Sequence, residues 1–249
     1  MSEPYPAPPL KIRTIEKFDG SLWRQYESSE SLIILTSAGR ELAAGGGLAP
    51  LLRGYAEDYL TETASSYEIP TSRRSFLAEG GSAKVFSVGN RNLVVKEARP
   101  LGDQLLPALE RMDTLINAVE NHCPRWIDIP KHYGVLISKQ DMTKQFLLME
   151  KIDDGVTVGD VLHYNQQPRE PHLKASVERL FHPVTEEVQK DIEHRFDQLR
   201  GHVRTALMAE YLSPDDYLPD IDHNAYNVVL EHLDTPVAGS NLKFWIIDQ

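Results

Sequence analysis

A twelve-residue stretch near the end of the sequence, from Pro219 to Leu230, most limits what this chain can fold into. It runs PDIDHNAYNVVL, so Asp222 and Asn227 lie five residues apart and an apolar run follows them. A second apolar run, FWII, ends on Asp248. Apolar runs of this kind predict strands, and two facing strands would bring both carboxylates and the carboxamide to one corner. Oxygen ligands of this type suit a magnesium ion that also binds phosphates.

Composition and charge argue against several classes of protein. The chain has 249 residues, of which 41% are hydrophobic and 25% charged, as is ordinary for a globular protein. Its net charge of −11 argues against nucleic-acid or membrane-surface binding as the main activity. No apolar run approaches the roughly 18 residues of a membrane span, and the first residues lack the apolar core of a signal peptide.

Cysteine usage indicates a reducing compartment. The single Cys123 excludes an internal disulfide and a multi-cysteine zinc site, so we expect a cytoplasmic location. We interpret Cys123 as a half-buried thiol rather than a nucleophile.

The pattern along the chain indicates three parts. Residues 1–70 form an N-terminal extension that we expect to be mainly helical, with a short strand over 32–35, a first helix that begins at Ser37 and a second helix over about 49–64. From residue 76 the pattern changes to strands, and beyond residue 152 it becomes mainly helical. We therefore expect domains over 1–70, 71–152 and 153–249.

The middle part predicts a five-stranded antiparallel sheet. Its first two strands flank a turn that contains Gly80, and Lys96 ends the third strand. The predicted strands lie within 76–88, which holds two of them, and at 93–96, 132–137 and 145–150. Apolar residues at i, i+3 and i+4 spacing predict amphipathic helices over 104–121 and 185–211.

Taken in order, these features resemble the protein-kinase superfamily. The catalytic and metal-binding loops of that family follow the pattern Asp-x4-Asn, then an apolar strand that ends in Asp. The hairpin around Gly80 is similar to the shortened glycine loop of RIO-like atypical kinases, and Met149-Glu150 is similar to the kinase hinge. The resemblance implies an α+β, kinase-like two-lobe fold, with the five-stranded sheet in an N-lobe over 71–152 and a reduced, mainly helical C-lobe over 153–249.

The resemblance also implies ATP and magnesium as cofactors. The backbone at Gly80, Gly81 and Ser82 would approach the phosphates, because small residues let N–H groups come close. Lys96 would hold the α- and β-phosphates, as the lysine on the third strand does in kinases.

The acidic partner of the lysine and the adenine contacts follow from the same resemblance. Glu110 lies at the depth expected of the partner in the helix over 104–121, whereas Asp113 and Glu120 lie closer to its apolar stripe. We favour Glu110 and leave the other two open. The backbone at Glu150 and Ile152 would hydrogen-bond the edge of the adenine.

The remaining roles fall at the C-terminal stretch, where the sequence also departs from the family. Asp222 would act on the acceptor hydroxyl, and Asn227 and Asp248 would hold magnesium. Asp220 replaces the usual histidine, and Asn224 stands where protein kinases have lysine. The sequence ends one residue after Asp248, so we expect no activation segment.

Three functions are compatible with these residues. The first is an ATP- and magnesium-dependent serine/threonine protein kinase of minimal type, which needs a protein substrate. The second is a small-molecule kinase that resembles aminoglycoside or choline phosphotransferases. The third is a pseudokinase that binds a partner. The four residues Lys96, Asp222, Asn227 and Asp248 together favour an enzyme, because a binding module has no need of all four.

Overall fold

The structure is a computed structural model of the whole chain. It describes residues 11–17, 22–27, 31–44, 74–79, 83–88, 93–98, 105–139, 145–153, 155–165, 171–217, 224–237 and 240–247. Two compact units can be distinguished. Unit 1 comprises Met1–Leu109 and Lys131–Lys151, and unit 2 comprises Glu110–Pro130 and Ile152–Gln249.

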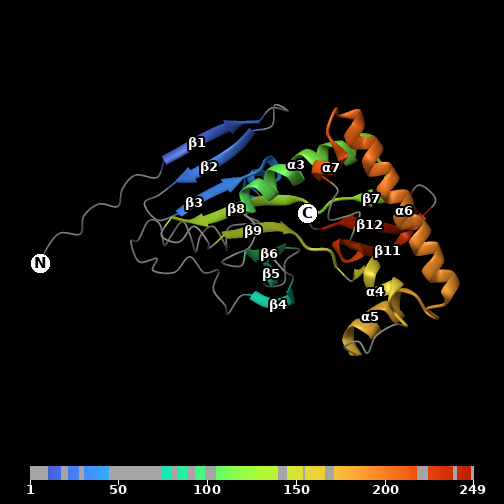
Figure 1. Ribbon diagram of the computed structural model, residues 1–249. Coiled ribbons are helices and arrows are strands. Elements are labelled where there is room, and N and C mark those ends of the chain that lie inside the picture. The colour runs from blue at the N-terminus through green and yellow to red at the C-terminus, as the bar shows by residue number, and fades with distance from the viewer. Residues whose placement is uncertain are drawn as a thin grey trace, which may run out of the picture. The chain divides into compact units, whose positions relative to one another are not determined.

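The described residues of unit 1 form an antiparallel sheet of eight strands. Their order across the sheet is β1-β2-β3-β8-β9-β6-β5-β4, and Figure 1 shows the strands from β1 to β9 side by side in this order. The strands are β1 Lys11–Glu16, β2 Leu22–Glu27, β3 Ser31–Leu35, β4 Arg74–Glu79, β5 Ala83–Val88, β6 Leu93–Ala98, β8 His132–Ser138 and β9 Gln145–Glu150. Sheet and helices together make the chain an α+β protein.

The sheet is larger than the five strands predicted from the sequence. The five predicted strands are present and contiguous, as β8-β9-β6-β5-β4. Strand β3 adds to them by pairing with β8, with Ile33 opposite Leu136. Because β3 lies inside the sheet it is buried on both faces: Ile33 and Leu35 join one apolar cluster, and Ile34 joins the other.

The prediction of a mainly helical N-terminal extension is wrong for the part of 1–70 that the structure describes. That part holds β1, β2 and β3 and a single helix, α1 Ser37–Ala44. Strands β1 and β2 escaped the prediction because KIRTIE and LWRQYE are rich in charged and polar residues, as is common near a sheet edge. The predicted helix over 49–64 lies outside the described residues.

Each face of the large sheet is covered by a helix. Ala38 and Leu42 of α1 pack on the cluster that contains Val95, and Leu106 and Leu109 of α3 (Leu105–His122) pack on the opposite cluster. Thr36 fixes the start of α1, because its hydroxyl donates to the His132 carbonyl at 2.6 Å and accepts the Gly39 N–H at 3.1 Å.

Gly39 is required by the close approach of α1 to β8. A Cβ placed on this residue would lie 1.7 Å from the backbone oxygen of Tyr133, which no side chain could tolerate.

Unit 2 combines helices with a smaller sheet. In the described part of this unit the sheet order is β10-β11-β12-β7, with β12 and β7 parallel. The elements are β7 Ile127–Asp128, β10 Val156–Thr157, α4 Val158–Leu162, α5 Pro171–Leu180, α6 Glu186–Ala209, α7 Pro214–Tyr217, the 3-10 helix η2 Ala225–Asn227, β11 Val228–Val237 and β12 Ser240–Ile246. The predicted C-terminal part is therefore not purely helical.

The long helix α6 confirms the prediction made from its apolar stripe. Its buried residues are Ile192, Phe196, Leu199, Val203, Ala206 and Leu207. Thr185 caps the helix, because its hydroxyl accepts the Val188 N–H at 3.2 Å. None of the helices in the described ranges is long and apolar enough to cross a membrane.

The two units differ from the three predicted domains in two respects. Residues 1–70 belong to unit 1 together with the predicted N-lobe and do not form a separate unit. The chain passes from unit 1 to unit 2 after Lys151, one residue from the predicted boundary. The segment from Glu110 to Pro130 nevertheless belongs to unit 2, because the later turns of α3 pack on the core that also contains Ile192 and Phe244.

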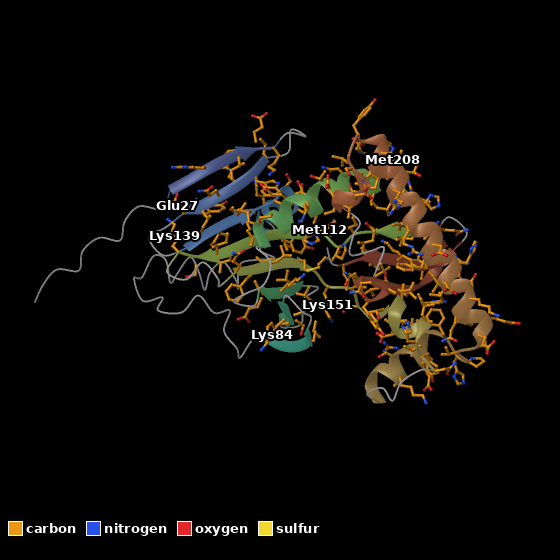
Figure 2. The ribbon with its side chains drawn as sticks, viewed as in Figure 1. Glu27, Lys84, Met112, Lys139, Lys151 and Met208 are labelled. Carbon is orange, nitrogen blue, oxygen red and sulfur yellow. The ribbon has the colours of Figure 1, made fainter. Side chains whose placement is uncertain are left out.

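We expect two methionines on the helices of unit 2 to differ sharply in their effect on stability. Met112 is 3% exposed and Met208 is 66% exposed (Figure 2). Met112→Ala should lower the free energy of unfolding by about 2–5 kcal/mol, because it leaves a cavity in the core. Met208→Ala should change it by less than about 0.5 kcal/mol. Urea unfolding of both variants checks this, and equal losses would contradict the described core.

Candidate functional site

The end of the β11–β12 hairpin brings two parts of the C-terminal motif together. The strands pair antiparallel, with Val228 opposite Ile246, as the two apolar runs predicted. Beyond this pair the Ile247 N–H donates to the Asn227 carbonyl at 2.9 Å. Asn227 therefore lies beside Ile247, the residue that precedes Asp248 in the sequence.

The turn that carries Asn227 is closed by its own side chains. Asn224 Oδ1 accepts the Tyr226 N–H at 3.0 Å, and Asn224 Nδ2 donates to Asn227 Oδ1 at 3.2 Å. The Asn227 N–H donates to the Asn224 carbonyl at 3.0 Å. These bonds orient the Asn227 carboxamide oxygen. A carboxamide oxygen has two lone pairs, so the hydrogen bond from Asn224 leaves Asn227 Oδ1 able to bind a cation as well.

The role of Asn224 was missed in the sequence. The sequence showed only that it stands where protein kinases have lysine, whereas in the structure both ends of its carboxamide are used within the turn. The signal was present, because asparagine is among the preferred residues at a helix N-cap and η2 begins immediately after it.

Lys96 lies on the face of the large sheet that α3 covers. It pairs with Val85 on β5 and Leu147 on β9. Because side chains alternate along a strand, Lys96 shares its face with Val94 and Ala98, which belong to the same cluster as Leu109 of α3. Lys96 is half-buried.

The three candidate partners of Lys96 differ in burial. Glu110 and Glu120 are exposed, and Asp113 is half-buried. All three belong to unit 2, whereas Lys96 belongs to unit 1. The pairing of Lys96 with Glu110 therefore stays a prediction.

The predicted adenine-binding segment has part of its backbone occupied. The Glu150 N–H donates to the Lys131 carbonyl at 2.8 Å, and the Glu150 carboxylate accepts the Lys131 N–H at 3.1 Å. Burial, followed by the nearby charge of Glu150, raises the pKa of Tyr133. Because the Glu150 N–H is already bound to Lys131, any adenine contact by the Glu150 backbone would use its carbonyl oxygen. Ile152 is half-buried and is the first residue of its segment in unit 2.

Several predicted site residues lie outside the described part of the chain. These are Gly80, Gly81, Ser82, Asp222 and Asp248. The strands that flank the three hairpin residues are present, and β4 and β5 place Glu79 opposite Lys84. In the described ranges no group of three or more His, Cys, Asp or Glu residues could hold a metal, and the predicted ligand Asp248 lies outside those ranges.

Comparisons with known proteins identify no relative. No family model matches the chain, and no curated protein or solved structure matches it significantly. Function must therefore be inferred from the chain's own residues.

Cys123 is a structural thiol outside this site. It shares a surface pocket with the buried residues Val119 and Ile127, and burial raises its pKa from 9.0 to about 11. A thiol with so high a pKa is almost entirely protonated at neutral pH and is a poor nucleophile.

We expect this thiol to be protected from alkylation in the folded protein. A pKa higher by about two units lowers the thiolate fraction at pH 8 about 100-fold, so iodoacetamide should react about 100-fold more slowly with the native chain than with the chain in urea. The native rate should rise with pH until the pH passes about 11. Equal rates in the two states would contradict the burial of Cys123.

Proposed function

We propose that this chain is an ATP- and magnesium-dependent phosphotransferase of a minimal kinase-like type. The hydrogen bond from Ile247 to Asn227 is the observation that carries the proposal. It fixes the backbone of Asn227 at the end of a hairpin whose other strand leads directly into Asp248. An Asn and an Asp related in this way provide the hard oxygen ligands that magnesium requires.

The metal-binding residues are assigned by the chemistry of their side chains. Asn227 is hydrogen-bonded to Ile247, and Asp248 directly follows Ile247 in the sequence. Because neighbouring Cα atoms are only about 3.8 Å apart, we assign Asn227 and Asp248 as the two residues that would hold the magnesium ion. A magnesium ion, when bound, neutralises charge on the phosphates. Asp222 lies five residues before Asn227 and is the residue that orients or deprotonates the acceptor hydroxyl.

The phosphate-binding residue is Lys96. It lies on the third strand counted from the predicted glycine hairpin, where kinases carry the lysine that binds the α- and β-phosphates. Its half-buried stem and apolar neighbours limit the directions in which the ammonium can point. The backbone of Gly80, Gly81 and Ser82 completes phosphate binding in this proposal.

The fold supports the proposal without identifying the acceptor. A sheet-containing unit followed by a unit built on a long helix is compatible with a two-lobe kinase-like fold, although the sheet has eight strands in the described residues rather than five. We infer an alcohol group as the acceptor, with a protein serine or threonine first and a small molecule second, in the cytoplasm.

A partner-binding pseudokinase is the alternative that one observation favours. Asn224 stands where protein kinases have lysine, and its carboxamide is committed to the turn. The position therefore contributes no positive charge to a transferred phosphate. Turnover, rather than nucleotide binding alone, separates the two functions.

Lys96→Ala should abolish most of the stabilisation that ATP and magnesium give to the folded protein. A ligand that binds the folded state raises the melting temperature, and loss of the phosphate contact should remove that shift at millimolar ATP. Lys84→Ala is the matched control, because Lys84 is exposed on the neighbouring strand (Figure 2) and points to the opposite face of the sheet. Equal shifts in both variants would remove Lys96 from the site.

Asp222→Asn and Asp248→Asn should separate catalysis from metal binding. Asp248→Asn should lose magnesium-dependent nucleotide binding. Asp222→Asn should retain binding and lose phosphoryl transfer by roughly 10²–10⁴-fold, the usual value of a general base. A nucleotide-binding assay at two magnesium concentrations and a turnover assay measure the difference. If both variants bind and turn over like the parent, the carboxylates are structural and the proposal fails.

A further inference from the structure

Tyr226, the residue before Asn227, lies against a glycine of α4. A Cβ placed on Gly159 would be 2.7 Å from two ring atoms of Tyr226 and 2.8 Å from a third. Real Cβ atoms do not approach aromatic rings this closely, so the contact exists only because residue 159 is glycine. Tyr226 is nevertheless 45% exposed, which distinguishes it from a core residue.

His163 forms the second side of this contact. Its ring is nearly parallel to that of Tyr226, with centroids 6.0 Å apart and an interplanar angle of 14°. His163 Nδ1 lies 3.0 Å from the Gly159 carbonyl, and because a carbonyl only accepts, Nδ1 carries the proton. The imidazole is thus held by its own helix. The Tyr226 hydroxyl lies 3.4 Å from the same nitrogen.

The backbone of Tyr226 belongs to the turn that holds Asn227. Its N–H is bound by Asn224, and Asn224 also orients the Asn227 carboxamide. The Tyr226 ring therefore connects the turn to α4, whose start is fixed separately by the Thr157 cap, which accepts the Asp160 N–H at 3.0 Å. A shift of the ring would move the backbone next to Asn227.

We propose that Tyr226 is a positioning residue, and that Gly159 and His163 form a seat for its ring that sets the turn of residues 224–227. Its chemical consequence, correct placement of Asn227 for magnesium, rests on the proposed function. The seat itself does not, because its effect on the turn can be measured in the free protein. The ring, rather than the hydroxyl, carries the effect, since the hydroxyl contact is long.

Hydrogen exchange in the free protein tests the seat directly. The reporters are the Asn227 amide, bound to the Asn224 carbonyl, and the Ile247 amide, bound to the Asn227 carbonyl. Gly159→Ala and Tyr226→Ala should each speed exchange at both amides by about 10-fold or more, whereas Tyr226→Phe should exchange like the parent. Gly159→Ala should add little in the Tyr226→Ala background, because the added methyl group then meets no ring.

Gly201→Ala is the matched control for a glycine replaced within a helix. A Cβ placed on Gly201 of α6 would meet nothing within 4 Å, so exchange at the two amides should not change. Unchanged exchange in both Gly159→Ala and Tyr226→Ala would overturn the seat, as would an equal effect of Gly201→Ala. Loss of protection in Tyr226→Phe would overturn the role given to the ring.

Magnesium-dependent nucleotide binding then tests the consequence for the site. Gly159→Ala and Tyr226→Ala should raise the magnesium concentration needed for half-maximal binding about 10-fold, and Tyr226→Phe should bind like the parent. If the variants lose amide protection but keep parental magnesium dependence, the positioning role is overturned. If the parent itself shows no magnesium-dependent binding, the proposed function fails, and the exchange result still decides whether the seat sets the turn.

Discussion

The register of the β11–β12 hairpin is the constraint on which the candidate site depends. The residues from Val228 to His232 of β11 pair in turn with those from Ile246 back to Leu242 of β12, and beyond the first pair a hydrogen bond joins Ile247 to Asn227. A slip of one residue would turn every side chain of the strand to the other face. Burial of Val228, Leu230, Phe244 and Ile246 prevents that slip, because exposing these apolar side chains would cost more free energy than a local hydrogen bond contributes. The core of unit 2 therefore determines where Asn227 lies relative to the end of β12.

The large sheet shows the same dependence of position on burial. Lys96 is held between Val85 and Leu147, and the apolar residues on either side of it along β6 are buried. A half-buried lysine can pack its aliphatic stem on apolar surface while its charged end stays in contact with water. Strand β3 extends the sheet by pairing with the edge of β8 that faces away from β9. The strands β1, β2 and β3 are thus part of the sheet and not an appendage to it.

Much of the local structure could be predicted from the sequence, because the signals for it lie within single strands and helices. The five strands, the helix α3 and the helix α6 follow from apolar spacing, which is set by the geometry of the backbone. The hairpin after Asn227 was predictable for the same reason. Strands β1 and β2 were not, because a polar strand near the edge of a sheet has no apolar pattern to reveal it.

By itself the sequence determined which residues the proposed chemistry would use: a lysine on a strand, an Asp-x4-Asn spacing and an aspartate after an apolar run. Tertiary structure alone decided that β3 pairs with β8, across about a hundred residues, because the pairing partner of a strand depends on distant segments that its own residues do not encode. It also decided that Tyr226 rests on Gly159. Contacts of side chains with another element exist only once both elements are packed, and for that reason they lie beyond any local pattern.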